Sequence, residues 1–243
     1  MQRFGIAATI FLVALGAATA AAAQAVVVSD GADIGFARGS TIEEGATLKV
    51  PAGRTLELID ASGKGQTIRG PFEGKLSTGT ASKAPDPSIL RALHFILIDQ
   101  RQKETGTVRA AGEKPQPPDA RLVDLSDSAT FCVAPGQLPQ LWRPAPRPHA
   151  TLTLMRLSNG TRGDVEWPAN QPTVAWPASV PLADGETYQA LLPSALVRPR
   201  LVIKLVPIDA PSVAEAQKLA EAGCREQALT MLEAIAAPGS DGH

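Results

Sequence analysis

Short runs of apolar and β-branched residues, separated by turn residues, follow an apolar leader at the start of the chain. The runs cover residues 26–28, 47–50, 55–59 and 66–68. The turn signals between them are Asp30-Gly31, Pro51-Ala52-Gly53 and Ser62-Gly63-Lys64-Gly65. Short runs bounded by Gly, Pro, Asp and Ser are typical of antiparallel strands. The pattern therefore predicts a small antiparallel β-module over residues 26–80.

The stretch ASGKGQTIRGPFEGKL at residues 61–76 places Lys64 between two glycines, as many phosphate-binding loops do. A phosphate loop requires G-x-x-x-x-G-K-[ST] between a strand and a helix, so that helix amides and the lysine converge on phosphate. Here Gly65 follows Lys64, and Gly70-Pro71 stands where the helix would run. We therefore expect a hairpin turn with a solvated lysine, and no nucleotide site.

The N-terminal stretch resembles the FecR-like periplasmic domain in its order of turn glycines and alternating apolar residues. The resemblance covers residues 26–76. The matching positions are Gly45, Leu48, Val50, Pro51, Gly53, Leu56, Leu58, Asp60, Gly63, Ile68, Gly70 and Pro71. It implies a small antiparallel β-structure with a sensory or regulatory role outside the inner membrane and without catalytic residues.

The hydrophobic period becomes helical in the segment PDPSILRALHFILIDQRQKE. Apolar residues follow helical spacing at Ile89, Leu90, Leu93, Ile96 and Leu97. Asp86 suits the N-cap and Pro87 the first turn, so the pattern predicts an amphipathic connector helix over residues 85–104. His94 lies beside the apolar stripe. Neither a second histidine nor a cysteine accompanies it at metal-ligand spacing, so we expect a partly buried or surface imidazole.

A second β-module is predicted beyond a proline-rich linker at residues 105–118, whose proline cluster fits neither a helix nor a central strand. Residues 119–208 contain seven short runs: RLVDL, ATFCVA, ATLTLMRL, RGDVEW, PTVAW, ETYQALL and RLVIKLVP. Turns such as Ser158-Asn159-Gly160 and Ala183-Asp184-Gly185 separate them. About seven strands at this spacing predict an immunoglobulin-like β-sandwich. The fold class expected for the whole chain is therefore mainly β.

Residues 211–237 show a second helical pattern, interrupted by a glycine. Ser212 followed by Glu215 is a capping box, and Gly223 suits a helix C-terminus. The helix-glycine-helix pattern is similar to half of a tetratricopeptide repeat. Since one copy cannot build a solenoid, we expect this C-terminal helical hairpin to dock on the second β-module.

The chain has two cysteines, Cys132 in a predicted strand and Cys224 at the break between the C-terminal helices. In an exported protein an even number of cysteines normally forms disulfides. A redox-active pair would be expected as C-x-x-C, which is absent. The sequence therefore predicts a structural disulfide that ties the C-terminal helices to the sandwich.

The first residues, MQRFGIAATIFLVALGAATAAAAQA, combine a basic Arg3, an apolar run and small residues ending in Ala23-Gln24-Ala25. This is the pattern of a secretory signal peptide, and we expect residues 1–25 to be removed by cleavage after Ala25. The apolar run is shorter than the roughly 20 residues that span a membrane. We therefore expect a periplasmic or secreted protein without stable membrane insertion after cleavage. A formal net charge of −1 argues against a nucleic-acid partner.

All three tryptophans lie in the second module, each followed closely by a proline: Trp142, Trp167 and Trp176. Exposed together, they would form a candidate binding surface for a sugar ring or a peptide. Buried separately, they would fill a core that has few other aromatic residues. Packing is the interpretation favoured here, and the binding surface stays open as the alternative.

Candidate catalytic chemistry is sparse. His94 and His149 are the ordinary candidates for a general base, and neither a G-x-S-x-G nor an H-E-x-x-H motif occurs. The carboxylate pairs Glu43-Glu44 and Asp164 with Glu166 sit where turns and strand edges are expected, where such side chains are usually solvated. We therefore expect no catalytic residues, no metal site and no cofactor, and a non-enzymatic protein that binds another envelope protein in a sensory, regulatory or scaffolding role. The alternative is an envelope glycan as ligand or substrate, bound by the three tryptophans and nearby carboxylates.

Overall fold

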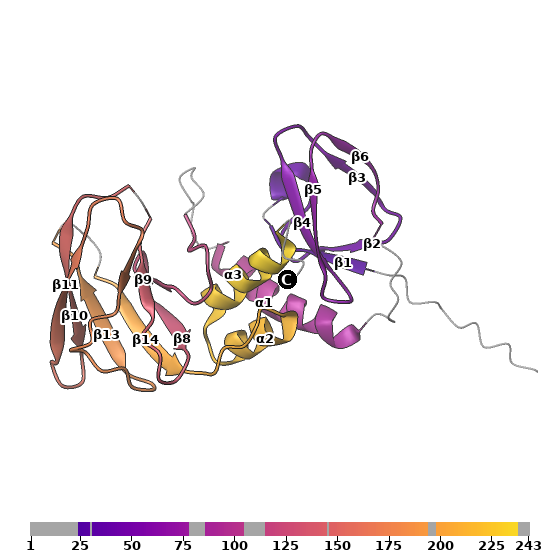
Figure 1. Cartoon of the computed structure of the whole chain (residues 1–243). Helices are drawn as coiled ribbons and strands as arrows, with labels where there is room; N and C mark the ends of the chain where they lie inside the picture. Colours follow the sequence, from indigo (N-terminus) through magenta and orange to yellow (C-terminus); the bar gives the residue numbers. More distant parts are fainter. Residues whose placement is uncertain are drawn as a thin grey trace, which may run out of the picture.

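The computed structural model describes residues 24–29, 31–77, 86–104, 115–144, 146–193 and 198–237. The molecule is mainly β, with strands in two modules and three helices. Figure 1 shows the helices between the N-terminal strands and the C-terminal strands. The expected signal peptide lies outside the described residues except for Gln24 and Ala25, and residues 105–114 of the expected linker lie outside them as well. No described helix combines the length and the apolar character needed to cross a membrane.

The N-terminal module contains two antiparallel sheets. Four strands lie in the order β2-β1-β4-β5, and two form the pair β3-β6. Their bounds are β1 Gln24–Val27, β2 Thr41–Glu43, β3 Thr47–Val50, β4 Thr55–Asp60, β5 Gly65–Arg69 and β6 Phe72–Lys75; a short 3-10 helix, η1 Ala32–Ile34, follows β1. The four strand runs seen in the sequence are confirmed. β2 and β6 were missed, because each is short and half-exposed.

The four-stranded sheet is covered on both faces. Ala25, Val27 and Leu58 pack toward the β3-β6 pair in one core, while Val26 and Ile59 pack in another core with the helices. Successive side chains of a strand point to opposite faces. An uninterrupted VVV run is therefore what a strand buried on both faces requires.

The glycine-rich stretch of residues 61–64 is the β4–β5 hairpin turn, as expected. Asp60 Oδ1 accepts hydrogen bonds from the backbone N–H groups of Ser62 at 2.8 Å and Lys64 at 3.0 Å. Gly63 has φ +84°, the left-handed conformation that favours glycine. The exposed Lys64 thus lies in a turn that the Asp60 side chain closes by hydrogen bonds to backbone N–H groups.

The three helices form one layer with a shared core. α1 Pro87–Glu104 begins after Asp86, whose Oδ1 accepts from the Ser88 N–H at 2.8 Å. Its predicted apolar row is confirmed, with Leu93, Ile96 and Leu97 at 2% exposure or less. α2 Val213–Glu221 and α3 Arg225–Ala236 pack against α1. Ser212 Oγ accepts from the Glu215 N–H at 3.1 Å, as its predicted N-cap role requires.

The C-terminal helical hairpin docks differently from the prediction. Rather than resting on the sandwich alone, α3 packs against β4 and β5 of the N-terminal module as well as β8 of the second. The two elements approach closely at Gly65 of β5, where a Cβ would lie 2.0 Å from the carbonyl oxygen of Ile235. Thr67 Oγ1 donates a hydrogen bond of 2.6 Å to the carbonyl of Ala236, at the end of α3. The apolar residues of the hairpin share one core with α1 and the N-terminal sheet, and only Ala120 and Cys132 of the second module are among the described buried residues of this core.

The second module contains two sheets around one core. Five strands lie in the order β11-β10-β13-β14-β8, and three in the order β12-β9-β7. The bounds are β7 Val123–Asp124, β8 Ala129–Val133, β9 Gln140–Trp142, β10 Ala150–Arg156, β11 Arg162–Trp167, β12 Thr173–Ala175, β13 Thr187–Leu191 and β14 Arg200–Leu205. Most pairs are antiparallel, but β14–β8 and β7–β9 are parallel. The seven predicted runs all contain strands, and β9 is an eighth that the surrounding prolines concealed.

Candidate functional site

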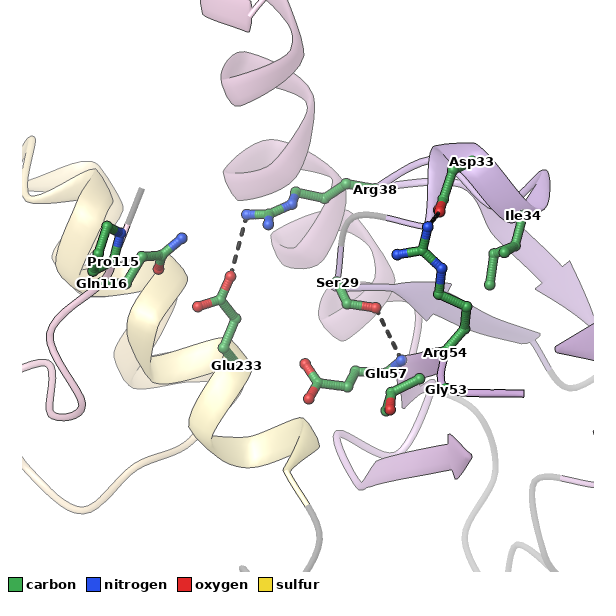
Figure 2. A pocket seen from close by; sticks show the side chains of 12 residues that line it. Ser29, Asp33, Ile34, Arg38, Gly53, Arg54, Glu57, Pro115, Gln116 and Glu233 are labelled. Carbon is green, nitrogen blue, oxygen red and sulfur yellow. Dashed lines mark hydrogen bonds and ion pairs between the residues drawn. The ribbon is translucent and has the colours of Figure 1, made fainter. Parts of the chain in front are cut away.

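A polar cleft of about 550 Å³ lies where the N-terminal module, the segment just before the second module and α3 meet. The N-terminal module contributes residues of the β1–η1 segment, the β3–β4 turn and β4. Pro115 and Gln116 form the opposite wall together with Glu233 of α3. Figure 2 shows these side chains around the opening. The cleft therefore joins segments from both ends of the chain.

The inner wall of the cleft contains an ion pair between the two ends of the chain. Arg38 Nη1 lies 3.3 Å from Glu233 Oε1, and the two side chains are 11% and 24% exposed. Arg38 Nε is buried without a hydrogen-bond partner among the described residues. Removing one member of a buried pair leaves the other charge uncompensated, which costs more than the intact pair contributes. The Arg38–Glu233 pair thus fixes α3 relative to the N-terminal module.

The outer wall contains a second ion pair, between Arg54 and Asp33 (Figure 2). Their side chains are 59% and 46% exposed. Exposed pairs contribute little to stability because water and salt screen them. These two charges can therefore exchange their contact with each other for contacts with a ligand at small cost.

Glu57 of β4 lies between the two ion pairs. Its backbone N–H donates a 3.0 Å hydrogen bond to Ser29 Oγ, and its carbonyl accepts from the Val28 N–H at 2.9 Å. Both bonds fix the backbone at this position. Figure 2 shows the Glu57 side chain extending toward the α3 side of the cleft. The cleft thus presents two guanidinium groups and three carboxylates within one opening.

This arrangement suits the binding of a charged, polar ligand. Arg side chains bind carboxylates, often with two parallel hydrogen bonds, and Asp and Glu accept bonds from Lys and Arg. No group of three or more His, Cys, Asp or Glu side chains within the described ranges could hold a metal ion. The geometry therefore favours recognition of mixed charge, such as the side chains of a peptide segment.

The three tryptophans do not form the binding surface that the sequence left open. Trp142, Trp167 and Trp176 are 5%, 0% and 2% exposed. Trp167 Nε1 donates to the carbonyl of Gln171 at 2.8 Å, and Trp176 Nε1 donates to that of Val180 at 2.7 Å. The indole N–H groups of Trp167 and Trp176 are thus satisfied inside the second module, where both rings belong to the core, and Trp142 is buried as well. The interpretation as an exposed binding surface is therefore wrong, because a module with so few aromatic residues needs these rings in its interior.

The tryptophan core also buries a cation. The guanidinium carbon of Arg143 lies 4.4 Å from the centre of the Trp167 ring, within the range of cation–π attraction. Arg143 Nη2 donates to the carbonyl of Pro148 at 3.0 Å. Burial lowers the pKa of Arg143, and the neighbouring charge of Arg147 lowers it further. Arg143 thus forms part of the module's packing.

The structure brings His149 and Glu166 together, but it places His94 in the other half of the molecule. His94 Nε2 lies 3.0 Å from Thr41 Oγ1 in the N-terminal half of the molecule, whereas His149 Nε2 lies 2.9 Å from Glu166 Oε2 on the second module. Asp164 accepts a 2.6 Å hydrogen bond from Thr153, its cross-strand neighbour on β10. His149 and Glu166 are more than half exposed, and these contacts form a polar row along β10 and β11.

The disulfide predicted from the sequence is confirmed. Cys132 of β8 and Cys224, the residue before α3, are joined with a Cα–Cα distance of 5.7 Å. Both residues are almost completely buried. The bond links residues 92 positions apart and anchors the start of α3 to the second module.

Sequence reasoning missed the cleft residues. Arg38, Arg54 and Glu233 lie in separate segments with no common motif, and the Arg54 side chain follows a turn that the sequence identified only as a break. Their proximity depends on the docking of α3, which was itself predicted incompletely.

The chain matches no protein-family model, no curated protein and no solved structure.

Proposed function

We propose that the protein is an exported, non-enzymatic accessory that binds another protein of the cell envelope in a sensory, regulatory or scaffolding role. The observation that carries the proposal is the mixed-charge cleft at the junction of the two modules. It has the size of a ligand site and is lined by residues that the fold holds in place from three separate segments.

The buried disulfide supports export to the periplasm or the cell exterior, because structural disulfides persist in oxidising compartments. The leader pattern at residues 1–25 supports the same location. Both observations support the proposed compartment, whereas the cleft supports the proposed binding of a partner protein.

The fold proposed for each module agrees with a binding role. We propose a FecR-like arrangement for β1 to β6. For the second module, an immunoglobulin-like sandwich is supported by its two sheets and by Tyr188 at the start of β13. The Tyr188 hydroxyl donates to the carbonyl of Pro181 at 2.8 Å and accepts from the Ala183 N–H at 3.0 Å. This contact resembles the tyrosine corner of such sandwiches. Modules of this kind commonly serve as binding scaffolds, although fold alone assigns no function.

In the partner we expect an extended segment that carries both basic and acidic side chains. Arg54 and Asp33 can each release the other and bind an opposite charge on the incoming segment. In the less exposed pair, Arg38 and Glu233 stay in contact with each other and form the inner wall of the site.

Position-specific crosslinking in the exported protein tests the proposal. A photoreactive amino acid placed at Thr55 or Gln116, both exposed cleft residues, is expected to capture the same envelope protein. The matched control is Ser158, an exposed residue of the β10–β11 turn on the second module. Arg54→Glu should weaken capture from Gln116, because it reverses a charge on the outer wall. Equal capture from Ser158, or capture unaffected by Arg54→Glu, would contradict the proposed site.

A further inference from the structure

The first two described residues are part of an interior strand. Gln24 pairs with Glu43 of β2, and Ala25 pairs with Ile42 of β2 on one side and Asp60 of β4 on the other. The carbonyl of Gln24 accepts a hydrogen bond from the Ala61 N–H at 3.1 Å. Because β1 has a neighbouring strand on each side, loss of its residues breaks hydrogen bonds to two strands, whereas loss from an edge strand breaks them to only one.

Ala25 also belongs to the apolar core. It is 1% exposed and packs in the core shared by the four-stranded sheet and the β3-β6 pair. The peptide bond that joins Ala25 to Val26 lies inside the sheet, between β2 and β4. Cleavage at this bond would remove two of the four residues of β1 and leave their partners in β2 and β4 without hydrogen bonds.

The leader offers several sites with the small-x-small pattern that signal peptidases require. The last is Ala23-Gln24-Ala25, the one before it is Ala21-Ala22-Ala23, and earlier ones include Ala18-Thr19-Ala20. The sequence favours the last site, whereas the pairing of β1 favours a site that leaves this strand whole, and Ala21-Ala22-Ala23 is the nearest such site. We infer that the leader is removed between Ala23 and Gln24, so that the mature chain begins with the first residue of β1. This inference rests on the proposed export.

The test is to express the full chain with a C-terminal tag in a Gram-negative host and to determine the N-terminus of the exported protein by intact mass and peptide sequencing. We expect the chain to start at Gln24, with or without loss of one ammonia as the terminal glutamine cyclises through its own α-amine. A start at Val26 would overturn the inference and leave export intact. A full-length chain retained in the cell would contradict the export itself, and with it the inference.

Two leader variants sharpen the result. Ala21→Phe places a bulky side chain at the first small position of the inferred site, leaves Ala23-Gln24-Ala25 unchanged, and should reduce processing at Gln24 at least severalfold. The matched control is Ala22→Phe, which changes the middle position of the same site and should be processed normally. If Ala21→Phe is processed like Ala22→Phe, the inferred site is wrong.

A stability measurement tests the structural reason separately. Mature chains that begin at Gln24 and at Val26, both with the disulfide formed, are compared by thermal unfolding. The shorter chain should unfold at a lower temperature, because its sheet lacks the start of β1. Equal midpoints would remove the physical basis of the inference.

Discussion

The side-chain amide of Gln227 makes the two hydrogen bonds to Cys132 that a neighbouring β-strand would make. Gln227 Oε1 accepts from the Cys132 N–H at 2.6 Å, and Gln227 Nε2 donates to the Cys132 carbonyl at 3.0 Å and to the Ala120 carbonyl at 2.6 Å. β8 is the last strand of its sheet, so an α3 side chain occupies part of an edge that would otherwise be open to another strand.

Replacing Gln227 with Leu should lower the free energy of unfolding by about 3 kcal/mol, because it leaves buried backbone groups of Cys132 and Ala120 without partners. Chemical denaturation of the oxidised protein measures the change. The matched control is Gln217→Leu on α2, whose amide donates a hydrogen bond to Glu221 on the exposed helix surface. This control should change stability by less than about 0.5 kcal/mol, and equal effects of the two variants would contradict the role assigned to Gln227.

Loss of the disulfide should lower the stability of the protein, and the native fold should protect the bond from reductants. Replacing Cys132 and Cys224 together with Ala opens a loop with a sequence separation of 92, which the chain-entropy model values at about 4.5 kcal/mol. Both cysteines are buried, so a reductant should open the bond slowly in native buffer and quickly in denaturant. Rapid reduction of the native protein, followed by thiol labelling, would show that the bond is accessible.

The two ion pairs of the cleft should differ in strength. A double-mutant cycle with Arg38→Met and Glu233→Gln is expected to give a coupling energy of about 2 kcal/mol, because both side chains are largely withdrawn from water. The same cycle with Arg54→Met and Asp33→Asn should give less than about 1 kcal/mol, because that pair is exposed. Added salt should weaken the second coupling more than the first. A stronger outer pair would exclude its proposed exchange with a ligand.

Gly65→Ala should loosen the contact between α3 and β5. The new Cβ would lie 2.0 Å from the carbonyl oxygen of Ile235, so α3 must shift, at a cost of about 2 to 3 kcal/mol. Hydrogen exchange should accelerate in the last turn of α3. Gly74→Ala on β6 is the matched control, since its nearest contact is the ring of Phe72 at 3.0 Å, which can move. Equal hydrogen-exchange rates in the last turn of α3 for the two variants would contradict a tight contact between Gly65 and α3.

Tryptophan fluorescence tests the glycan alternative. Because all three indoles are buried, emission of the native protein should be blue-shifted and poorly quenched by acrylamide. Peptidoglycan or polysaccharide fragments should leave it unchanged, and the unfolded protein serves as the exposed reference. Quenching or a spectral shift on adding glycan fragments would reinstate the tryptophans as a binding surface.

Local patterns in the sequence predicted most elements of the fold. The run of Thr55 to Ile59, the row from Ile89 to Leu97 and the Ser212–Glu215 cap depend on neighbouring residues, and all three appear in the structure. Strands β2, β6 and β9 were missed, because β2 and β6 are short and half-exposed and β9 lies between prolines.

The contacts that build the cleft could not be predicted in the same way. Arg38 and Glu233 meet because α3 reaches the N-terminal module, and that reach depends on Gly65 and on apolar residues contributed by three helices. The disulfide was predictable because only two cysteines exist. The choice between buried and exposed tryptophans needed the core volume of the second module, which a single sequence does not supply.

The docking of the C-terminal hairpin has a consequence for how the chain is made. α2 and α3 follow every described strand in the sequence, yet their apolar faces complete the core against β1 and β4, among the first strands. Contacts between such distant segments form late, since the chain must first close a long loop. During synthesis, Val26, Val28 and Ile59 therefore lack part of their final partners until the last helices have left the ribosome.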